Sequence, residues 1–320
     1  MSEFVSQFAK DIERFIALKR AFGYENKSLV SPIKRFDKFC AEYYPSVNDL
    51  TRELTMRWLS VESETSNTKR KASVIRQFGK YLSAIGRTSY ILPDNFVLSK
   101  SKFAPYIPGE KELAAFFAAT DSIKHTNRNP RAHLIAPVLF RLLYTCGLRP
   151  NEGRELKTED INLQTGEIII RRNKQHKERI VVMSDDMLSL CVDYNEKRIC
   201  LGTDGIFFFP ADGDKPYNTK KLWVLCKACW RKANPGVTKE NLPSFRPYDL
   251  RHCFASTVIH RWLNEGRKVE AMLPHLRAYM GHVTFNSTIY YVHLMPEHLI
   301  RSSGVDLTAF EKLLPEVVDE

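Results

Sequence analysis

The sequence predicts a mainly α protein of the α+β class, in which an N-terminal helical bundle precedes a larger, mostly helical domain with a small antiparallel β-sheet. Three observations predict this class. Apolar residues recur at helical spacing through the first hundred residues, a stretch with three prolines interrupts that spacing at 91–108, and two runs rich in β-branched residues follow inside 161–183. A chain of 320 residues also exceeds the usual size of one domain, so two domains are expected.

The first domain is expected at residues 1–92, because its apolar residues form three one-sided helical faces. Residues three and four positions apart lie on the same side of a helix and can be buried together. The three faces are Phe8, Ile12, Phe15 and Ile16; Ile33, Phe36 and Cys40; and Val74, Ile75, Phe78, Tyr81 and Leu82. Packed against one another, they predict a small helical bundle.

The third of these helices is preceded by three consecutive cations, Lys69, Arg70 and Lys71, which follow the capping-type residues Asn67 and Thr68. Cations at a helix N-terminus oppose the helix dipole, which makes the arrangement poor for an isolated helix. It suits a DNA phosphate, because backbone N–H groups and cations then point the same way. A solvated basic turn is the alternative, and the sequence leaves both open.

A linker is expected at 93–108, where helical spacing lapses, and its Lys100 and Lys102 are further candidates for DNA contact. The second domain is expected at 109–320. Its predicted elements are a helix at 109–117, an apolar helix at 133–146 closed by Gly147, a β-hairpin within 161–183, helices again from Leu222, and a short amphipathic helix at 306–315 that opens with a Thr-x-x-Glu capping box.

The charge balance favours a polyanionic partner. The chain holds 48 Lys and Arg against 37 Asp and Glu, a formal charge of +11, and residues 1–107 alone hold 18 basic and 11 acidic side chains. Such an excess attracts nucleic acid or an anionic membrane surface, although a solvated basic face is the plain alternative. The charged N-terminus and the lack of a long apolar segment predict a cytoplasmic protein without a membrane partner.

The seven cysteines are scattered and odd in number, which argues against a disulfide framework and agrees with a reducing compartment. Cys226 and Cys229 form one CxxC, but no second pair follows at zinc-ligand spacing. We therefore interpret the pair as neighbours on one face of a helix.

Four short segments carry the residues suited to phosphate chemistry. They read GLRPNE at 147–152, NKQHKERIVV at 173–182, YDLRHCFAS at 248–256 and YMGHVTFNSTIYYVH at 279–293. Each has a plain structural explanation by itself: Arg149 could pair with Glu152 on the surface, and Arg251 could be a buried arginine satisfied by Asp249. It is their order and spacing together that point to one site.

In that order the segments resemble the tyrosine recombinases of the phage integrase family, which have an arginine after Gly-Leu, a hairpin lysine, a His-x-x-Arg-His, a Leu-Gly-His and a final tyrosine. The resemblance covers the whole chain, because the N-terminal bundle is similar to the family's core-binding domain. It implies a site-specific recombinase that cleaves and rejoins DNA without a metal, a nucleotide or any other cofactor. The chain contains no Walker A loop and no HExxH, which agrees.

The resemblance also implies a role for each matched residue. Arg149 and Arg251 hold the non-bridging oxygens of the scissile phosphate, since planar guanidinium groups match phosphate geometry and stay charged. Lys174 donates a proton to the leaving 5′ oxygen, with Lys177 as its rival. His282 hydrogen-bonds the phosphate. Supporting or DNA-contacting roles are expected for Glu152, His252, Lys177 and Arg179.

Tyr291 is the predicted nucleophile, which attacks phosphorus to form a 3′-phosphotyrosyl bond. Tyr290 is an alternative, but Ile289 and His293 frame Tyr291 as in the family's Ile-Tyr-x-His. Tyr248 departs from the family, which has His or Lys three residues before the second arginine. Tyrosine can donate a hydrogen bond to phosphate but is a poor general base near neutral pH, so the proton acceptor for Tyr291 stays open.

Two other functions compete with this interpretation. One is a non-catalytic DNA-binding protein on the same scaffold, and the other is a hydrolase that uses His275 and His282, whose seven-residue separation does not suit a helical ligand pair. The expected partners of a recombinase are double-stranded DNA recombination sites and further copies of the chain. The resemblance implies chains that are monomeric in solution and form a tetrameric synapse on DNA, with the 306–315 helix docking on a neighbouring subunit.

Overall fold

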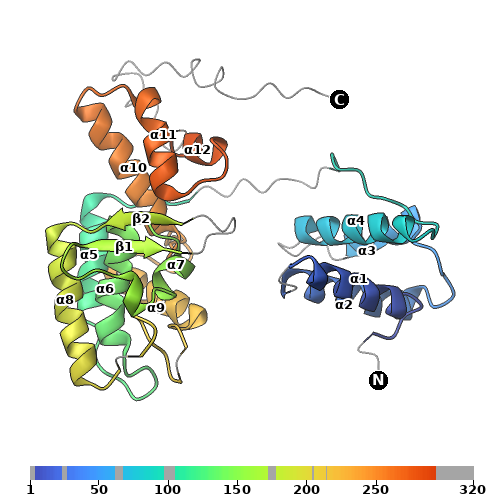
Figure 1. The fold of residues 1–320 in the computed structure, drawn as a ribbon, viewed down its shortest axis with the longest axis horizontal. Helices are drawn as coiled ribbons and strands as arrows, with labels where there is room; N and C mark the ends of the chain where they lie inside the picture. The colour runs from blue at the N-terminus through green and yellow to red at the C-terminus, as the bar shows by residue number, and fades with distance from the viewer. Residues whose placement is uncertain are drawn as a thin grey trace. The chain divides into compact units, whose positions relative to one another are not determined.

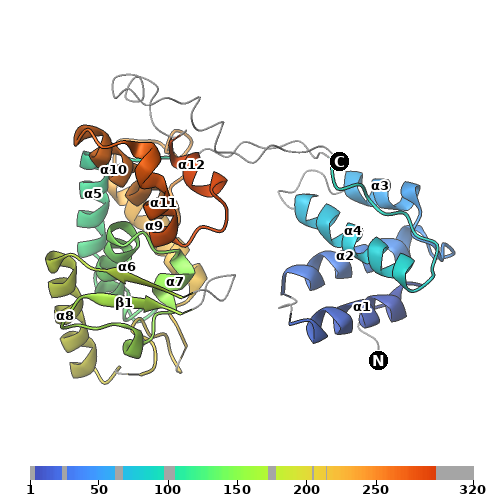
Figure 2. The ribbon, with the colours of Figure 1, turned by 45° about the horizontal axis from the view of Figure 1, so that its top comes forward.

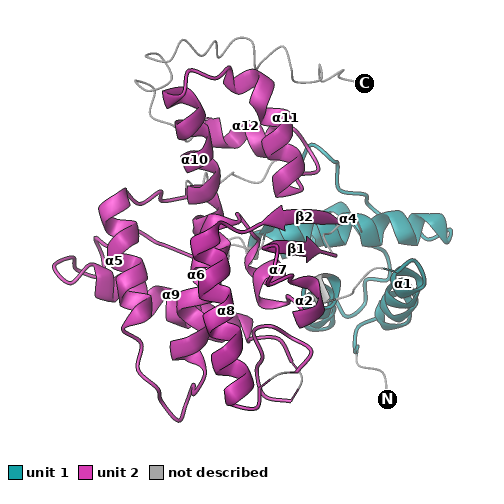
Figure 3. Cartoon of the chain, turned by 60° about the vertical axis from the view of Figure 1, so that its left-hand side comes forward, with its two compact units in different colours: residues 1–103 teal, residues 104–320 magenta. Residues whose placement is uncertain are grey.

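The computed structural model describes residues 4–23, 27–61, 68–96, 105–171, 178–203, 205–213 and 215–292. The chain forms two compact units, Met1–Phe103 and Ala104–Glu320, coloured separately in Figure 3. The division falls inside the range predicted as a linker. Lys100 and Lys102 lie outside the described residues. No helix in the described ranges is long and apolar enough to cross a membrane.

The first unit is a bundle of α1 (Ala9–Ala21), α2 (Lys27–Tyr43), α3 (Arg52–Val61) and α4 (Thr68–Ala84), shown in blue to cyan in Figures 1 and 2. Its core is aromatic: the ring centroids of Phe8, Phe36 and Phe78 lie 5.9 to 6.2 Å apart, and Phe36 also meets Trp58 edge to face at 5.2 Å. The three predicted apolar faces are confirmed, since all their members are buried except Tyr81, which packs against the core partly exposed.

Helix α4 begins at Thr68, next to the predicted basic cluster, but the cluster does not act as one unit. Lys69 and Arg70 are exposed, whereas Lys71 is 0% exposed and its ammonium lies 5.8 Å from the Trp58 ring centroid. Burial, followed by the charge of Arg35, lowers the pKa of Lys71. The predicted phosphate contact of Lys71 is therefore wrong, because helical phase places it one turn before Ile75 on the buried face.

The second unit is built around α6 (Ala132–Thr145), which packs against α5, α8, α9 and α10. The other elements are α5 (Glu110–Asp121), α7 (Pro150–Arg154), the 3-10 turn η1 (Thr158–Asp160), β1 (Glu167–Ile170), β2 (Arg179–Val182), α8 (Asp185–Cys200), α9 (Thr219–Ala233), α10 (Asp249–Asn264), α11 (Val269–Met280) and α12 (Asn286–Val292). This confirms the predicted mostly helical unit with a small antiparallel sheet.

Strands β1 and β2 form the two-stranded antiparallel sheet of the described residues, with Ile168 opposite Val181 and Ile170 opposite Arg179. Their alternation buries Ile168, Ile170 and Val181 in the core of the second unit and leaves Ile180 on the solvent side. Lys174 and Lys177 belong to the connection between the strands and lie outside the described residues.

Gly147 ends α6 in the left-handed conformation, with φ of +60°, as the predicted helix cap requires. A Cβ at this position would lie 2.4 Å from Cδ1 of Phe254 on α10, so the close approach of α10 also demands glycine. The chain then turns into α7 through Arg149. This junction brings α6, α7 and α10 together.

The two cysteines of the CxxC lie on α9, as the interpretation of the pair as helical neighbours predicted. Cys226 and Cys229 are both free and buried, and the Cys226 thiol donates to the Phe245 carbonyl at 3.9 Å. Within the described residues, no group of three or more His, Cys, Asp or Glu side chains is arranged to hold a metal ion.

Candidate phosphate-binding active site

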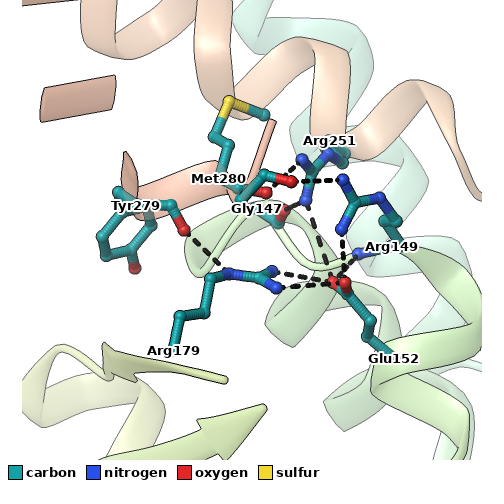
Figure 4. Close-up of polar contacts among 8 residues, drawn as sticks. Gly147, Arg149, Glu152, Arg179, Arg251, Tyr279 and Met280 are labelled. Carbon is teal, nitrogen blue, oxygen red and sulfur yellow. Dashed lines mark hydrogen bonds and ion pairs between the residues drawn. The ribbon is translucent and has the colours of Figure 1, made fainter. Parts of the chain in front are cut away.

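The buried carboxylate of Glu152 on α7 is the centre of a cluster of three arginines (Figure 4). Its carboxylate accepts hydrogen bonds from the Arg149 backbone N–H at 2.9 Å and side chain at 2.6 Å, and from Arg179 at 2.8 and 3.1 Å. Arg251 lies 3.8 Å away as a third cation. Burial raises the pKa of the 5% exposed Glu152 side chain, but the hydrogen bonds and charges of Arg179 and Arg149 outweigh it and hold that pKa at about 2.

The same three arginines bind three consecutive backbone carbonyls where α11 ends. The Tyr279 carbonyl accepts from Arg179 Nε at 2.8 Å, the Met280 carbonyl from Arg251 at 2.6 Å, and the Gly281 carbonyl from Arg149 at 2.8 Å. A helix C-terminus leaves carbonyls without intrahelical partners and carries partial negative charge, so cations are stabilised there. Figure 4 shows the guanidinium groups converging between α7 and α11.

Arg251 is 0% exposed and comes from the first turn of α10. It donates to the Gly147 carbonyl at 2.7 Å in addition to Met280. Burial and the neighbouring charge of Arg149 lower its pKa, while Tyr291 and Glu152 act in the opposite sense. The pairing with Asp249 that the sequence allowed is absent from the ion pairs of Arg251, because Asp249 instead binds Arg246 at 2.7 Å.

A cavity of about 490 Å³ opens beside this cluster. It brings together most of the residues predicted to act in catalysis. Its lining is Arg149, Tyr248, His252, His282, Val283, Asn286, Ser287, Tyr290 and Tyr291. The sequence analysis missed three of these residues: Val283, and Asn286 and Ser287 at the start of α12. Their position between His282 and Tyr291 was the feature of the sequence that could have identified them.

Tyr291 lies between two imidazoles. Its ring centroid is 5.7 Å from that of His282, in a stacked arrangement, and 5.4 Å from that of His252. The side chain is 2% exposed, and burial raises the pKa of its hydroxyl to about 12, although the charge of Arg251 and a hydrogen bond from it act to lower that pKa. Tyr290 is 36% exposed, and burial raises the pKa of its hydroxyl as well.

Both imidazoles are neutral at physiological pH. Burial first, and then the charges of Arg251 and Arg149, lower the pKa of His282 to about 3. Burial also lowers the pKa of His252 to about 4. His282 Nδ1 is oriented by the Thr288 hydroxyl at 2.9 Å, a contact that sequence reasoning missed even though Thr288 lies three positions before Tyr291 on the buried face of α12.

Tyr248 precedes α10 and stands at the edge of the cavity. It is 36% exposed, and its ring meets His252 edge to face with centroids 5.1 Å apart. The residue that departs from the family pattern therefore borders the same cavity as Tyr291 and contacts the imidazole beside it.

Arg179 was predicted to contact DNA, and that prediction is wrong. Its side chain is 8% exposed, and its guanidinium is committed to Glu152 and the Tyr279 carbonyl. Strand alternation explains the placement, because Arg179 lies two positions before the fully buried Val181 and therefore on the same face of β2.

The family model described as "Phage integrase family" matches residues 110–298. The chain belongs to the phage integrase family. It is 27% identical over 297 residues to "Putative integrase/recombinase y4rE" of Sinorhizobium fredii, which covers 91% of this chain and 93% of the relative. It is 26% identical over 314 residues to "Tyrosine recombinase XerD" of Rickettsia bellii, covering 93% and 96%.

Among solved structures, the chain is similar to the XerH site-specific recombinase bound to a palindromic difH substrate in a post-cleavage complex. That match has a TM-score of 0.65 at 18% identity and covers 87% of this chain and 78% of the other. It shows the shared fold. The family model and the named relatives identify a tyrosine-type site-specific recombinase, as the sequence predicted, and nothing in these matches favours a non-catalytic DNA-binding protein.

Proposed function

We propose that this chain cleaves and rejoins double-stranded DNA at specific sites, with Tyr291 as the nucleophile of a 3′-phosphotyrosyl intermediate. The observation that carries the proposal is that Arg149, His282 and Tyr291 line one cavity, while the buried Arg251 is held behind it by the carbonyl of Met280, two residues before His282. Two cations and a neutral imidazole next to a phenol are the groups that an in-line attack on a phosphodiester requires.

Arg149 and Arg251 are proposed to bind the non-bridging oxygens of the scissile phosphate and to stabilise the charge of the pentacoordinate transition state. Arg149 lines the cavity directly. In the described part of the chain, the buried Arg251 Nε and His252 Nδ1 have no hydrogen-bond partner. An unsatisfied buried nitrogen costs free energy, so a ligand that accepts from Arg251 is favoured.

The proposed reaction balances as a transesterification. The Tyr291 oxygen forms a bond to phosphorus, the bond from phosphorus to the 5′ oxygen breaks, and Lys174 gives that oxygen a proton. Lys177 is the alternative donor. Religation is the reverse, with a 5′ hydroxyl of the partner strand as the nucleophile. Because a phosphodiester is exchanged for a phosphotyrosyl ester, no external energy source is needed.

The phenol proton must leave Tyr291 for the attack. His252, His282 and Tyr248 are acceptors that border the cavity beside Tyr291, and His282 is already assigned to the phosphate. We favour His252, because its imidazole is neutral at physiological pH and can accept a proton, whereas a phenol hydroxyl is a poor general base near neutral pH. Tyr248 then contributes a hydrogen bond to the phosphate.

DNA is the proposed partner, and the exposed Lys69 and Arg70 at the start of α4 are the candidate phosphate contacts of the first unit. The proposed assembly is a tetrameric synapse of chains that are monomeric without DNA. The segment 306–315, outside the described residues, is the proposed docking element between neighbouring subunits.

A covalent-trapping assay tests the function. A duplex bound by the protein is first selected from a random library, and a nick beside the scissile phosphate then lets the cleaved fragment diffuse away, so that the phosphotyrosyl adduct accumulates. The wild-type chain and Tyr290→Phe are expected to form the adduct, whereas Tyr291→Phe is expected to bind the duplex and form none. An adduct in Tyr291→Phe that is lost in Tyr290→Phe would overturn the assignment, and bound duplex without any adduct would overturn the enzymatic function.

A further inference from the structure

Arg179 has no assigned role in the proposed reaction, yet its guanidinium makes three hydrogen bonds within the cluster around Glu152. It opens β2, and its guanidinium points into the protein. Three of its nitrogens are used: Nε binds the Tyr279 carbonyl at 2.8 Å, and the two terminal nitrogens bind the two carboxylate oxygens of Glu152 at 3.1 and 2.8 Å.

These bonds join three separate segments of the second unit. They connect the sheet, through β2, to α7 at Glu152 and to the end of α11 at Tyr279 (Figure 4). The residues next to these contacts belong to the reaction site, since Glu152 holds Arg149 and the carbonyl after Tyr279 holds Arg251. His282 follows the same helix end.

Packing around Arg179 is tight enough to define its position. A Cβ on Gly281 would lie 3.2 Å from the Arg179 Nη1 atom and 3.3 Å from its Cδ, and Gly281 itself has a φ of +62°. The carbonyl of this same glycine accepts the hydrogen bond from Arg149. A shift of the Arg179 guanidinium therefore acts on the backbone that orients Arg149.

Only arginine can make this set of contacts. Its planar fork matches the two oxygens of a carboxylate while Nε stays available in the same plane, whereas the lysine ammonium is a point charge. Without Arg179, the buried Glu152 would keep Arg149 and the more distant Arg251 as its cationic partners. One carboxylate would then draw both arginines toward itself and away from a phosphate.

We infer that Arg179 is a positioning residue, which occupies the Glu152 carboxylate and the end of α11 so that Arg149 and Arg251 are aimed at the scissile phosphate. The inference rests on the proposed function. In this role Arg179 does not contact DNA and affects the reaction only through Glu152, Arg149 and Arg251. A misplacement of about 1 Å at a catalytic group costs on the order of 100-fold in rate, which sets the expected effect.

The test compares single-turnover cleavage of two nicked duplexes of identical sequence. One carries the ordinary scissile phosphate, and the other carries a methylphosphonate, in which a methyl group replaces one charged oxygen. Arg179→Gln is expected to lose on the order of 100-fold on the phosphate and less than about tenfold on the methylphosphonate, because the uncharged linkage asks less of the arginine pair. Arg179→Lys is expected to resemble Arg179→Gln. Equal losses on the two duplexes, with each rate expressed per folded protein, would overturn the inference.

A double-mutant cycle covers the case in which Arg179→Gln is partly unfolded. If Arg179 acts through Glu152, the loss in Arg179→Gln with Glu152→Gln should not exceed that of Glu152→Gln alone, whereas independent roles would multiply. Multiplicative losses would overturn the inference. Arg154→Gln is the matched control, because Arg154 lies on α7 and contacts Asn151 and Glu155 instead of the Glu152 carboxylate.

The result also separates this inference from the proposed function. Adduct formation by wild type on both duplexes, together with equal losses in Arg179→Gln, would overturn the positioning role and leave the recombinase intact. A wild-type chain that binds the phosphate duplex without forming adduct would instead overturn the proposed function.

Discussion

The Tyr291 ring is stacked on the His282 ring, with centroids 5.7 Å apart and an angle of 19° between the planes. Stacking holds the phenol against an imidazole that is itself fixed by Thr288. Because Tyr291 is buried and its pKa is raised to about 12, the hydroxyl is protonated and a poor nucleophile in this arrangement. Tyr291 must therefore lose its proton before it can attack DNA, and this step depends on the groups that surround it.

The two neutral imidazoles make stability depend on pH. In the unfolded chain each histidine binds a proton below a pKa of about 6.5, whereas in the folded chain His282 and His252 do so only near 3 and 4. Between these limits the unfolded state binds more protons than the folded state. The contribution of the two neutral imidazoles to the free energy of unfolding is therefore complete above pH 6.5 and is lost as the pH falls toward 4.

Thermal unfolding measured from pH 7.5 to 4.5 is therefore expected to show a falling Tm, and the fall is expected to be smaller in His252→Phe, which has no proton to bind there. His260→Gln is the control, because His260 is exposed on α10. Equal slopes for His252→Phe and the wild type would contradict the origin given for this pH dependence.

Glu152→Gln is expected to destabilise the second unit, because it removes the one carboxylate that Arg149, Arg179 and Arg251 share. Removal of one partner of a buried ion pair costs about 3–5 kcal/mol, since the remaining charge stays buried. Urea unfolding at pH 7 measures this loss. Glu155→Gln, three residues along, is expected to change stability by less than about 0.5 kcal/mol because its carboxylate is half exposed.

Gly147→Ala tests the junction that places Arg149. The added Cβ would be strained by the left-handed backbone at this position and would lie 2.4 Å from the Phe254 ring. The free energy of unfolding is therefore expected to fall by more than the roughly 1–2 kcal/mol that the backbone conformation alone would cost. Gly202→Ala is the matched control, since φ is +62° there and no atom lies within 4 Å of the added Cβ.

Combining Gly147→Ala with Phe254→Ala separates the two effects. The second change removes the ring that blocks the Cβ, so the cost of Gly147→Ala measured in a Phe254→Ala background is expected to fall to that of Gly202→Ala. An unchanged cost in this background would show that the contact with Phe254 contributes nothing.

Local patterns in the sequence predicted most elements of both units, although not α3, α7 or α8. Helical spacing identified the buried faces of α1, α2 and α4, and Gly147 marked the end of α6 because its conformation depends on few neighbours. The order of Arg149, Arg251, His282 and Tyr291 predicted which side chains share one region, and the structure places them around one cluster.

Polar contacts between residues far apart in the sequence could not be predicted from local sequence patterns. The Arg149 guanidinium meets the Gly281 carbonyl across 132 residues, and no spacing rule connects the two. Arg179 could have been placed inside by strand alternation with Val181, but its partner Glu152 lies 27 residues away on another element. Asp249 could pair with Arg246 or with Arg251 at similar sequence separation, and the structure pairs it with Arg246.

The basic cluster at the start of α4 supplies the last prediction, because its members face in different directions. Lys69→Gln and Arg70→Gln are expected to weaken DNA binding, each reducing the slope of log K against log salt by about 1, as loss of one phosphate contact does. Lys71→Met is expected to leave the affinity and the slope unchanged, since this side chain is buried beside Trp58. Salt titrations of binding to one duplex by fluorescence anisotropy compare the three variants, and a slope that falls in Lys71→Met but stays constant in Lys69→Gln would contradict the orientation of α4.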